Sequence, residues 1–332
     1  MSKAVSLPFF IPTFATYHNG LACGLVFGDS VDGELQMMNQ SIGLICSNDF
    51  LYGRTTPDLL LPDTSWSTFP NILKHFVHLK YAEKYFHYII HDSLDDHAYI
   101  VFAGFDDYYL PGKSWYGIRH MDHDGVICGY DDEEGIYEVA AYDIDWNLRI
   151  IKISQKAFEE SLNKAFELGY SPVIISIKQN STKIELNLKA ICAKLKKYSN
   201  SDIKKYPPEK KGLVYDFAVH DYMVMYMDKL IDGSIDHEKM DWRIVRAIWE
   251  YRVCMCRRLE IIEEKLNFSS EASEEFSKVV EETNRLRMLY AIYNKKSKSS
   301  LVISVRDGLD KLKDREREIL EPFVQKMEEA IK

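Results

Sequence analysis

The chain has 332 residues, of which 46% are hydrophobic and 13% aromatic, and its formal net charge is -9. This composition supplies a buried core for one or two domains and argues against a disordered chain. The acidic balance argues against nucleic-acid binding, because nucleic-acid-binding domains present basic surfaces. Six cysteines in a chain of this length are too few for a disulfide scaffold.

The sequence shows no signal for a membrane or for export. No long apolar run follows Lys3, which argues against a signal peptide. No stretch of about 18 apolar residues occurs, which argues against a membrane span. We therefore expect a cytoplasmic protein with no membrane partner, in which a reducing environment keeps Cys23 as a free thiol.

The first half of the chain mixes strand and helix patterns. Residues 1–20 are predicted to be extended, and Gly20 precedes a short helix over about 21–28 that carries Cys23 in its first turn. Residues 70–91 predict one or two helices, and 155–168 an amphipathic helix that Ser154 caps. Strands are predicted by apolar runs and turn signals at 98–105, 125–130, 136–142, 148–153 and 173–177.

The second half of the chain is predicted to be almost purely helical. Seven lysines between Lys194 and Lys211, together with Pro207-Pro208, indicate an exposed linker. Apolar residues then recur at three-and-four spacing from Trp242 to Ile262, and further helices are expected on either side. We predict an α+β protein with a first domain over 1–200 and a helical bundle over 213–332.

Three residues have the chemistry of an acyl-transfer site. Cys23 lies among small residues at a helix start, where the helix dipole lowers a thiol pKa. His123 begins one predicted strand, and Asp143 ends the next. Because neighbouring antiparallel strands can bring these two together, we predict Cys23 as nucleophile, His123 as base and Asp143 as the residue that orients the base.

Each of these roles has an alternative. Cys23 could be a small core residue, since free cysteines are often buried. His120 is the rival base, although an odd separation along an extended segment puts it on the opposite face from His123. Asp145 rivals Asp143 as the orienting acid.

Other residues are candidates for the oxyanion hole and the substrate channel. Tyr17 and Asn19 could donate to the oxyanion, or they could be a packing residue and a cap. Aromatic residues in the loop before His123 could wall a channel, and nearby acids could attract a protonated amine; the candidates are Asp106, Tyr108, Tyr109, Trp115 and Asp122. The Cys254 and Cys256 pair lacks further ligands, so we expect no metal site. We also expect no bound cofactor.

Three blocks of sequence resemble the papain-like domain that opens the butirosin-biosynthesis-H type of acyltransferase. They are Leu21-Ala22-Cys23-Gly24, residues 106–111 followed by 120–132, and residues 137–143 followed by 147–150. The resemblance covers about residues 14–180, and it extends to the cysteine-protease homologues that form amide bonds in closthioamide-type polythioamide assembly. It implies a papain-like cysteine-protease fold over 1–200, with a C-terminal helical bundle.

The resemblance also implies an activity. Cys23 would take an acyl or peptidyl group from the phosphopantetheine thioester of an acidic carrier protein and pass it to an amine or a diamine, as in nonribosomal peptide or antibiotic biosynthesis. The lysines between 194 and 211 could then dock the carrier. One departure weakens a peptidase assignment, because papain-like peptidases have glutamine where this chain has Tyr17. The alternatives are a cysteine peptidase and a non-catalytic binding protein on the same fold.

Overall fold

The computed structural model describes residues 3–10, 31–40, 42–59, 72–145, 147–179 and 183–332. Its contacts divide the chain into two units, each described by itself. The sheet unit comprises Met1–Glu34 and Trp66–Ile184, and the helical unit comprises Leu35–Ser65 and Glu185–Lys332. The expected α+β class, with an antiparallel sheet and a helical C-terminal region, is confirmed. The division differs from the expected one, because Leu35–Ser65 packs with the helices and the helical unit begins at Glu185.

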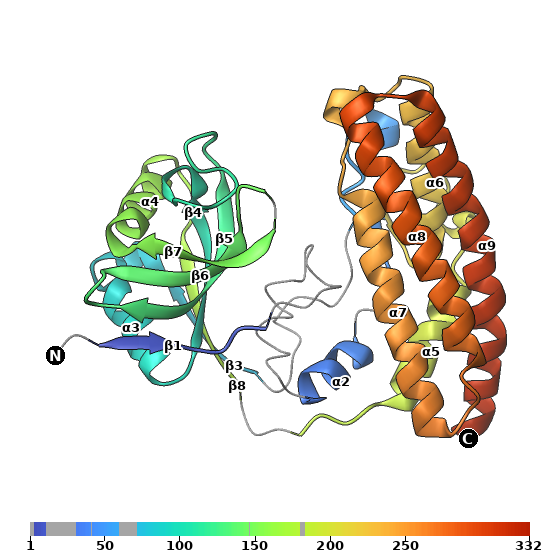
Figure 1. The fold of residues 1–332 in the computed structure, drawn as a ribbon, viewed down its shortest axis with the longest axis horizontal. Helices are drawn as coiled ribbons and strands as arrows, with labels where there is room; N and C mark the ends of the chain where they lie inside the picture. Colours follow the sequence, from blue (N-terminus) through green and yellow to red (C-terminus); the bar gives the residue numbers. More distant parts are fainter. Residues whose placement is uncertain (1–2, 11–30, 41, 60–71, 146, 180–182) are drawn as a thin grey trace. The chain divides into compact units, whose positions relative to one another are not determined.

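The sheet unit is built on seven described strands, all paired antiparallel. In sheet order they run β3-β8-β4-β5-β6-β7, and β1 pairs with β5 (Figure 1). Their bounds are β1 (Ala4–Ser6), β3 (Ile72–His78), β4 (Tyr99–Asp106), β5 (Asp122–Asp131), β6 (Ile136–Tyr142), β7 (Leu148–Ser154) and β8 (Val173–Gln179). The predicted strands in this region are all present. The prediction of helix for residues 70–91 is wrong for 72–78, which form β3.

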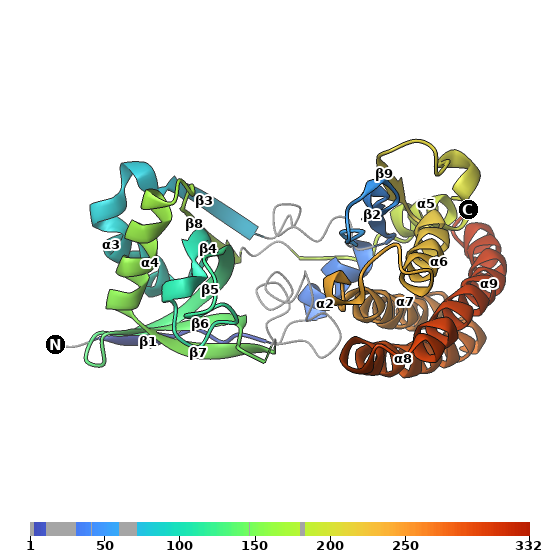
Figure 2. The ribbon, with the colours of Figure 1, turned by 90° about the horizontal axis from the view of Figure 1, so that it is seen from above.

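Helices α3 (Phe86–Asp95) and α4 (Gln155–Glu167) pack on the same face of this sheet (Figures 1 and 2). The Ser154 hydroxyl accepts a hydrogen bond from the Ala157 N–H at 3.1 Å, so it caps α4 as the sequence predicts. Phe158 on α4 packs edge-on against Phe102 and Phe105 of β4, with ring centroids 5.1 and 5.8 Å apart. Burial of these aromatic residues fixes α4 over β4.

A β-bulge in β4 shapes the end of that strand. The pairing with β5 shifts between Phe102 and Phe105, and Gly104 has a φ of 74° in the left-handed region. A Cβ at Gly104 would lie 3.0 Å from the Ser171 carbonyl oxygen, so a larger residue does not fit without a shift. Beyond the bulge Phe105 lies opposite His123, which brings the end of β4 beside the start of β5.

The helical unit contains long helices that run alongside one another and a two-stranded sheet (Figures 1 and 2). Its helices are the C-terminal part of α2 (Val31–Asn39), α5 (Leu188–Ser199), α6 (Ala218–Ile231), α7 (Ile244–Leu266), α8 (Glu271–Lys296) and α9 (Ser299–Ala330), and its strands are β2 (Ile45–Ser47) and β9 (Leu213–Tyr215). The lysine-rich stretch predicted as a linker lies within this unit, partly on α5. Among the described residues, no helix combines the length and apolarity that a membrane crossing requires.

A fully buried polar network joins five helices of the helical unit. The Arg252 Nε of α7 donates to Glu316 Oε2 of α9 at 2.9 Å, and its guanidinium also donates to Thr283 of α8 at 2.8 Å. The Tyr198 hydroxyl of α5 donates to Glu316 Oε1 at 2.6 Å and accepts from His220 Nε2 of α6 at 2.8 Å. Burial opposes ionisation of Glu316, but the charges of His220 and Arg252 outweigh it and hold the pKa of this carboxyl at about 2.

The C-terminal end of α2 is held by a buried arginine from α7. The guanidinium of Arg258 donates to the carbonyl oxygens of Met38 at 3.0 Å and Gln40 at 2.7 Å. These are carbonyls that a helix end leaves without an intrahelical partner, and a cation is favourable there because of the helix dipole. Arg258 therefore fixes the end of the helix that follows the segment carrying Cys23.

Candidate active site

Two adjacent carboxylates lie where β4 ends. Asp106 is the last residue of the strand and Asp107 begins the short 3-10 helix η5 (Asp107–Tyr109). Both side chains are fully buried, and each contacts a histidine: Asp106 contacts His120, which precedes β5, and Asp107 contacts His123, the second residue of β5. Carboxylates are buried only when they are paired or hydrogen-bonded, so each acid needs these partners.

Asp107 pairs with His123 and with a buried lysine. His123 Nδ1 donates to Asp107 Oδ2 at 2.9 Å. Lys113 Nζ lies 2.5 Å from Oδ1 as an ion pair, and it also donates to the Asp124 carbonyl oxygen at 2.7 Å. Lys113 is fully buried, with its ammonium 5.1 Å from the ring centre of Phe102. The lysine therefore compensates the carboxylate charge, while the second carboxylate oxygen holds the imidazole.

This contact gives His123 the geometry of a general base. Donation of the Nδ1 proton to Asp107 leaves the lone pair on Nε2. The His123 side chain is 28% exposed, and within the described part of the chain its Nε2 forms an ion pair at 4.0 Å with the exposed Asp124 carboxylate. Among the described residues, none forms a hydrogen bond with Nε2, while the contact with Asp107 fixes the ring orientation from the buried side.

Asp106 holds the second histidine and the loop around it. Its Oδ2 accepts from His120 Nδ1 at 2.7 Å, and its Oδ1 accepts from the backbone N–H groups of Tyr108 at 3.1 Å and Met121 at 3.2 Å. The His120 ring stacks on Tyr108, with centroids 4.4 Å apart, and its side chain is 47% exposed. Asp106 therefore organises the loop, and His120 stands at its surface as the rival base expected from the sequence.

The predicted orienting acid, Asp143, makes different contacts. Its Oδ1 accepts from the backbone N–H groups of Asp145 at 2.9 Å and Asn147 at 2.8 Å, and its Oδ2 lies 3.1 Å from Arg149 Nε. Within the part of the chain that the structure describes, Asp143 and His123 share no hydrogen bond or ion pair. The carboxylate that contacts His123 in the structure is therefore that of Asp107, not that of Asp143.

The physical reason lies in the pairing at the end of β6. The register that pairs Val126 with Ala140 would, if continued, put His123 opposite Asp143. Instead, the backbone of Asp143 bridges to Lys113 from the loop after η5. That loop fills the position beside the end of β6 and delivers the Lys113 ammonium to the buried acid.

The other predicted residues are placed as follows. Cys23, Tyr17 and Asn19 lie outside the described residues. Tyr109 packs edge-on against Tyr108 and lies 5.9 Å from the ring of His120. Trp115 is half-buried with the Arg119 guanidinium 5.9 Å from its ring, and Asp122 is exposed opposite Asp106. The aromatic residues Tyr108 and Tyr109 thus gather around His120.

The described cysteines are poor nucleophiles. All five are buried, and burial raises each thiol pKa: to about 12 for Cys128 and Cys254, to about 11 for Cys256, and above its usual range for Cys46 and Cys192. A thiol with a raised pKa stays protonated near neutral pH and does not attack. Among the six cysteines, Cys23 is therefore the remaining candidate.

No group of three or more histidine, cysteine or acidic side chains in the described residues could hold a metal ion. Sequence reasoning missed Asp107 as the partner of His123 and missed Lys113 altogether. The available signal was an Asp-Asp pair directly after a buried strand, since such acids need partners.

A scan of protein-family models finds no match to this chain, and a search of curated proteins finds no related sequence.

Proposed function

We propose that this protein is a cysteine-dependent acyltransferase on a papain-like fold. In the proposal Cys23 is the nucleophile, His123 the base and Asp107 the residue that orients the base. The observation that carries it is the pair of His123 Nδ1 with a fully buried carboxylate, which leaves Nε2 without a hydrogen bond from any described residue. The raised thiol pKa values of the other cysteines support Cys23 as the partner of this base.

The acyl donor in this proposal is a thioester on the phosphopantetheine arm of a carrier protein. His123 Nε2 takes the proton of the Cys23 thiol, and the thiolate attacks the thioester carbonyl carbon. The new carbon–sulfur bond forms on Cys23, the old one breaks, and the leaving thiolate takes the proton from His123. Tyr17 and Asn19 remain the proposed donors to the oxyanion.

The second half of the reaction makes an amide. An amine attacks the acyl-enzyme, His123 takes one amine proton, and the Cys23 sulfur leaves and receives that proton. Because an amide is more stable than a thioester, this half runs downhill when water is kept away. The aromatic loop of Tyr108, Tyr109 and Trp115 supports such a channel, and exposed Asp122 beside it supports attraction of a cationic amine. A cytoplasmic location fits, since it keeps the thiol reduced.

The proposal is tested by acyl loading from a small thioester. The protein is mixed with an N-acetylcysteamine thioester and its intact mass is measured, with Cys23→Ala as the test variant and Cys256→Ala as the matched cysteine control. We expect one acyl adduct on the wild type and on Cys256→Ala, no adduct on Cys23→Ala, and discharge to an amide when a diamine is added. Loading followed only by hydrolysis would instead support a peptidase, and no loading would support a binding protein.

A further inference from the structure

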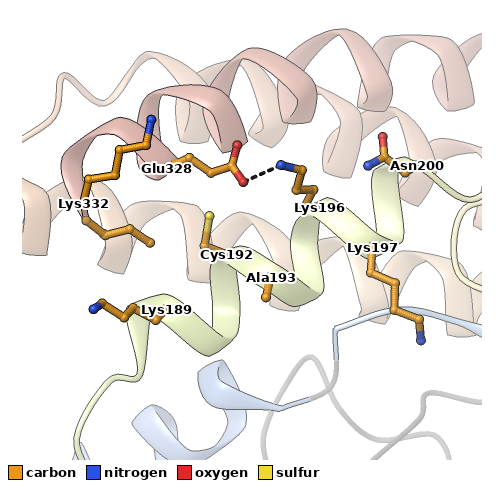
Figure 3. A pocket seen from close by; sticks show the side chains of 9 residues that line it. Lys189, Cys192, Ala193, Lys196, Lys197, Asn200, Glu328 and Lys332 are labelled. Atoms are coloured by element: carbon orange, nitrogen blue, oxygen red, sulfur yellow. Dashed lines mark hydrogen bonds and ion pairs between the residues drawn. The ribbon is translucent and has the colours of Figure 1, made fainter.

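A basic concavity lies on the helical unit, between α5 and the C-terminal end of α9 (Figure 3). Its volume is about 770 Å³. Among the described residues that line it, four are lysines and one is an acid, namely Lys189, Lys196, Lys197, Lys332 and Glu328. The lining therefore has a formal charge of +3 although the whole chain carries -9, so the concavity is a local reversal of the charge of the protein.

Three of these lysines share α5. Lys196 and Lys197 follow Lys189 by seven and eight residues, a spacing that returns to the same side of a helix. Lys196 Nζ is compensated by Glu328 at 2.6 Å, an ion pair drawn in Figure 3, and Lys197 lies 3.5 Å from Asp216. Lys189 forms no ion pair within the described part of the chain. The positive charge of the concavity is therefore only partly compensated.

The rest of the lining adds a second lysine without an ion pair and an apolar floor. Lys332, like Lys189, has no ion pair with any described residue, and it approaches from beyond the end of α9. The lining also includes Cys192, which is buried at 3% exposure, and Ile331. The volume of the concavity falls within the range of about 300–1,000 Å³ that small-molecule sites have.

We propose that this concavity binds a small organic phosphate. A phosphate group has up to two negative charges and three acceptor oxygens, which match ammonium groups that donate in three directions. Lys189 and Lys332 would hold the phosphate, because neither side chain has an ion pair with a described residue, and the organic part would lie on Cys192 and Ile331. The lining residues belong to the helical unit and include neither Cys23 nor His123, so the inference does not depend on acyl transfer.

The probe for this site is 1-naphthyl phosphate, measured by isothermal titration calorimetry at about 0.15 M ionic strength, where diffuse surface attraction is screened beyond about 8 Å. We expect binding with a Kd below about 1 mM, and weaker binding of inorganic phosphate because it leaves the apolar floor uncovered. The proposal would be overturned if naphthyl phosphate gave no measurable heat at concentrations up to about 10 mM. Equal affinity for naphthyl phosphate and inorganic phosphate would also overturn it.

Paired variants separate a site from general charge. Lys189→Gln with Lys332→Gln should weaken naphthyl phosphate binding about tenfold or more, since two charge-assisted hydrogen bonds are lost. Lys204→Gln with Lys205→Gln removes two exposed lysines outside the concavity and should change the Kd less than about twofold. Glu328→Gln should strengthen binding, because it frees Lys196. The site would be refuted if both double lysine variants weakened naphthyl phosphate binding equally. It would also be refuted if the variant with Lys189→Gln and Lys332→Gln kept the wild-type affinity.

Discussion

The substitution Asp107→Asn tests the assignment of the orienting acid. It keeps the shape of a fully buried side chain but removes the carboxylate that faces both His123 and Lys113. An asparagine amide can donate to Nδ1, which would favour the tautomer that lacks a lone pair on Nε2, and a change of this kind lowers kcat by about 10⁴-fold in serine proteases. We expect a loss of about 10³–10⁴-fold in the rate of acyl loading.

The same substitution also affects stability. It leaves the Lys113 ammonium buried without its ion pair, which costs about 3–5 kcal/mol in comparable sites. The double variant Asp107→Asn with Lys113→Met removes both charges and should recover most of that free energy of unfolding without recovering activity. Urea unfolding and single-turnover loading, measured on the same preparations, therefore separate the structural role of Asp107 from its positioning role.

The matched control is Asp143→Asn. In the structure Asp143 holds a turn and Arg149, so its substitution should reduce loading less than about tenfold, in line with a local structural effect. If Asp143→Asn lost about 10³-fold while a folded Asp107→Asn remained active, the contact between His123 and Asp107 would not be the one used in catalysis.

Three further outcomes are expected. His120→Ala should lower loading no more than about tenfold, because Asp106 orients it mainly as part of the loop, whereas His123→Ala should lose about 10³-fold or more; the reverse order in single-turnover assays would make His120 the base. Glu316→Gln should destabilise the protein by about 3–5 kcal/mol in urea unfolding at pH 7, because Arg252 loses its buried partner. An unchanged urea midpoint would show that the pair of Arg252 with Glu316 does not stabilise the fold. Since the folded pKa of Glu316 is about 2 and its ordinary value is 4.5, the ionised carboxylate stabilises the fold above pH 4.5, and the gap between wild type and variant should narrow as pH falls from 4.5 toward 2. Arg258→Met should loosen the end of α2 and speed hydrogen exchange of the α2 amides by about tenfold or more, and unchanged exchange would mean that the carbonyl contacts do not fix this helix.

The elements that local sequence determines were predicted well. The strand pattern of 136–142 matches β6, and Ser154 caps α4 because a side-chain oxygen at that position satisfies a free N–H. The segment 70–91 was predicted as helix, yet 72–78 form β3. Its aromatic and histidine residues show no clear periodicity, and the strand depends on pairing with β8, about one hundred residues away.

The contacts of His123 could be predicted only in part, because its carboxylate partner is not local in the sequence. His123 at the start of a strand could be found from the sequence, and it lies where expected at the start of β5. Asp107 could not be chosen over Asp143 without the loop that carries Lys113 to the end of β6. The place of Leu35–Ser65 in the helical unit likewise depends on distant partners, such as Arg258 on α7.

The most direct test of the central claim is the pH profile of Cys23 alkylation by iodoacetamide, followed residue by residue with peptide mass spectrometry. If Cys23 and His123 form a catalytic pair, the imidazolium stabilises the thiolate, and wild-type Cys23 should react well below the ordinary thiol pKa of about 8.5. In His123→Ala the profile should return to about 8.5. A Cys23 profile near 8.5 in both proteins would show that the two residues do not interact, and would contradict the proposed active site.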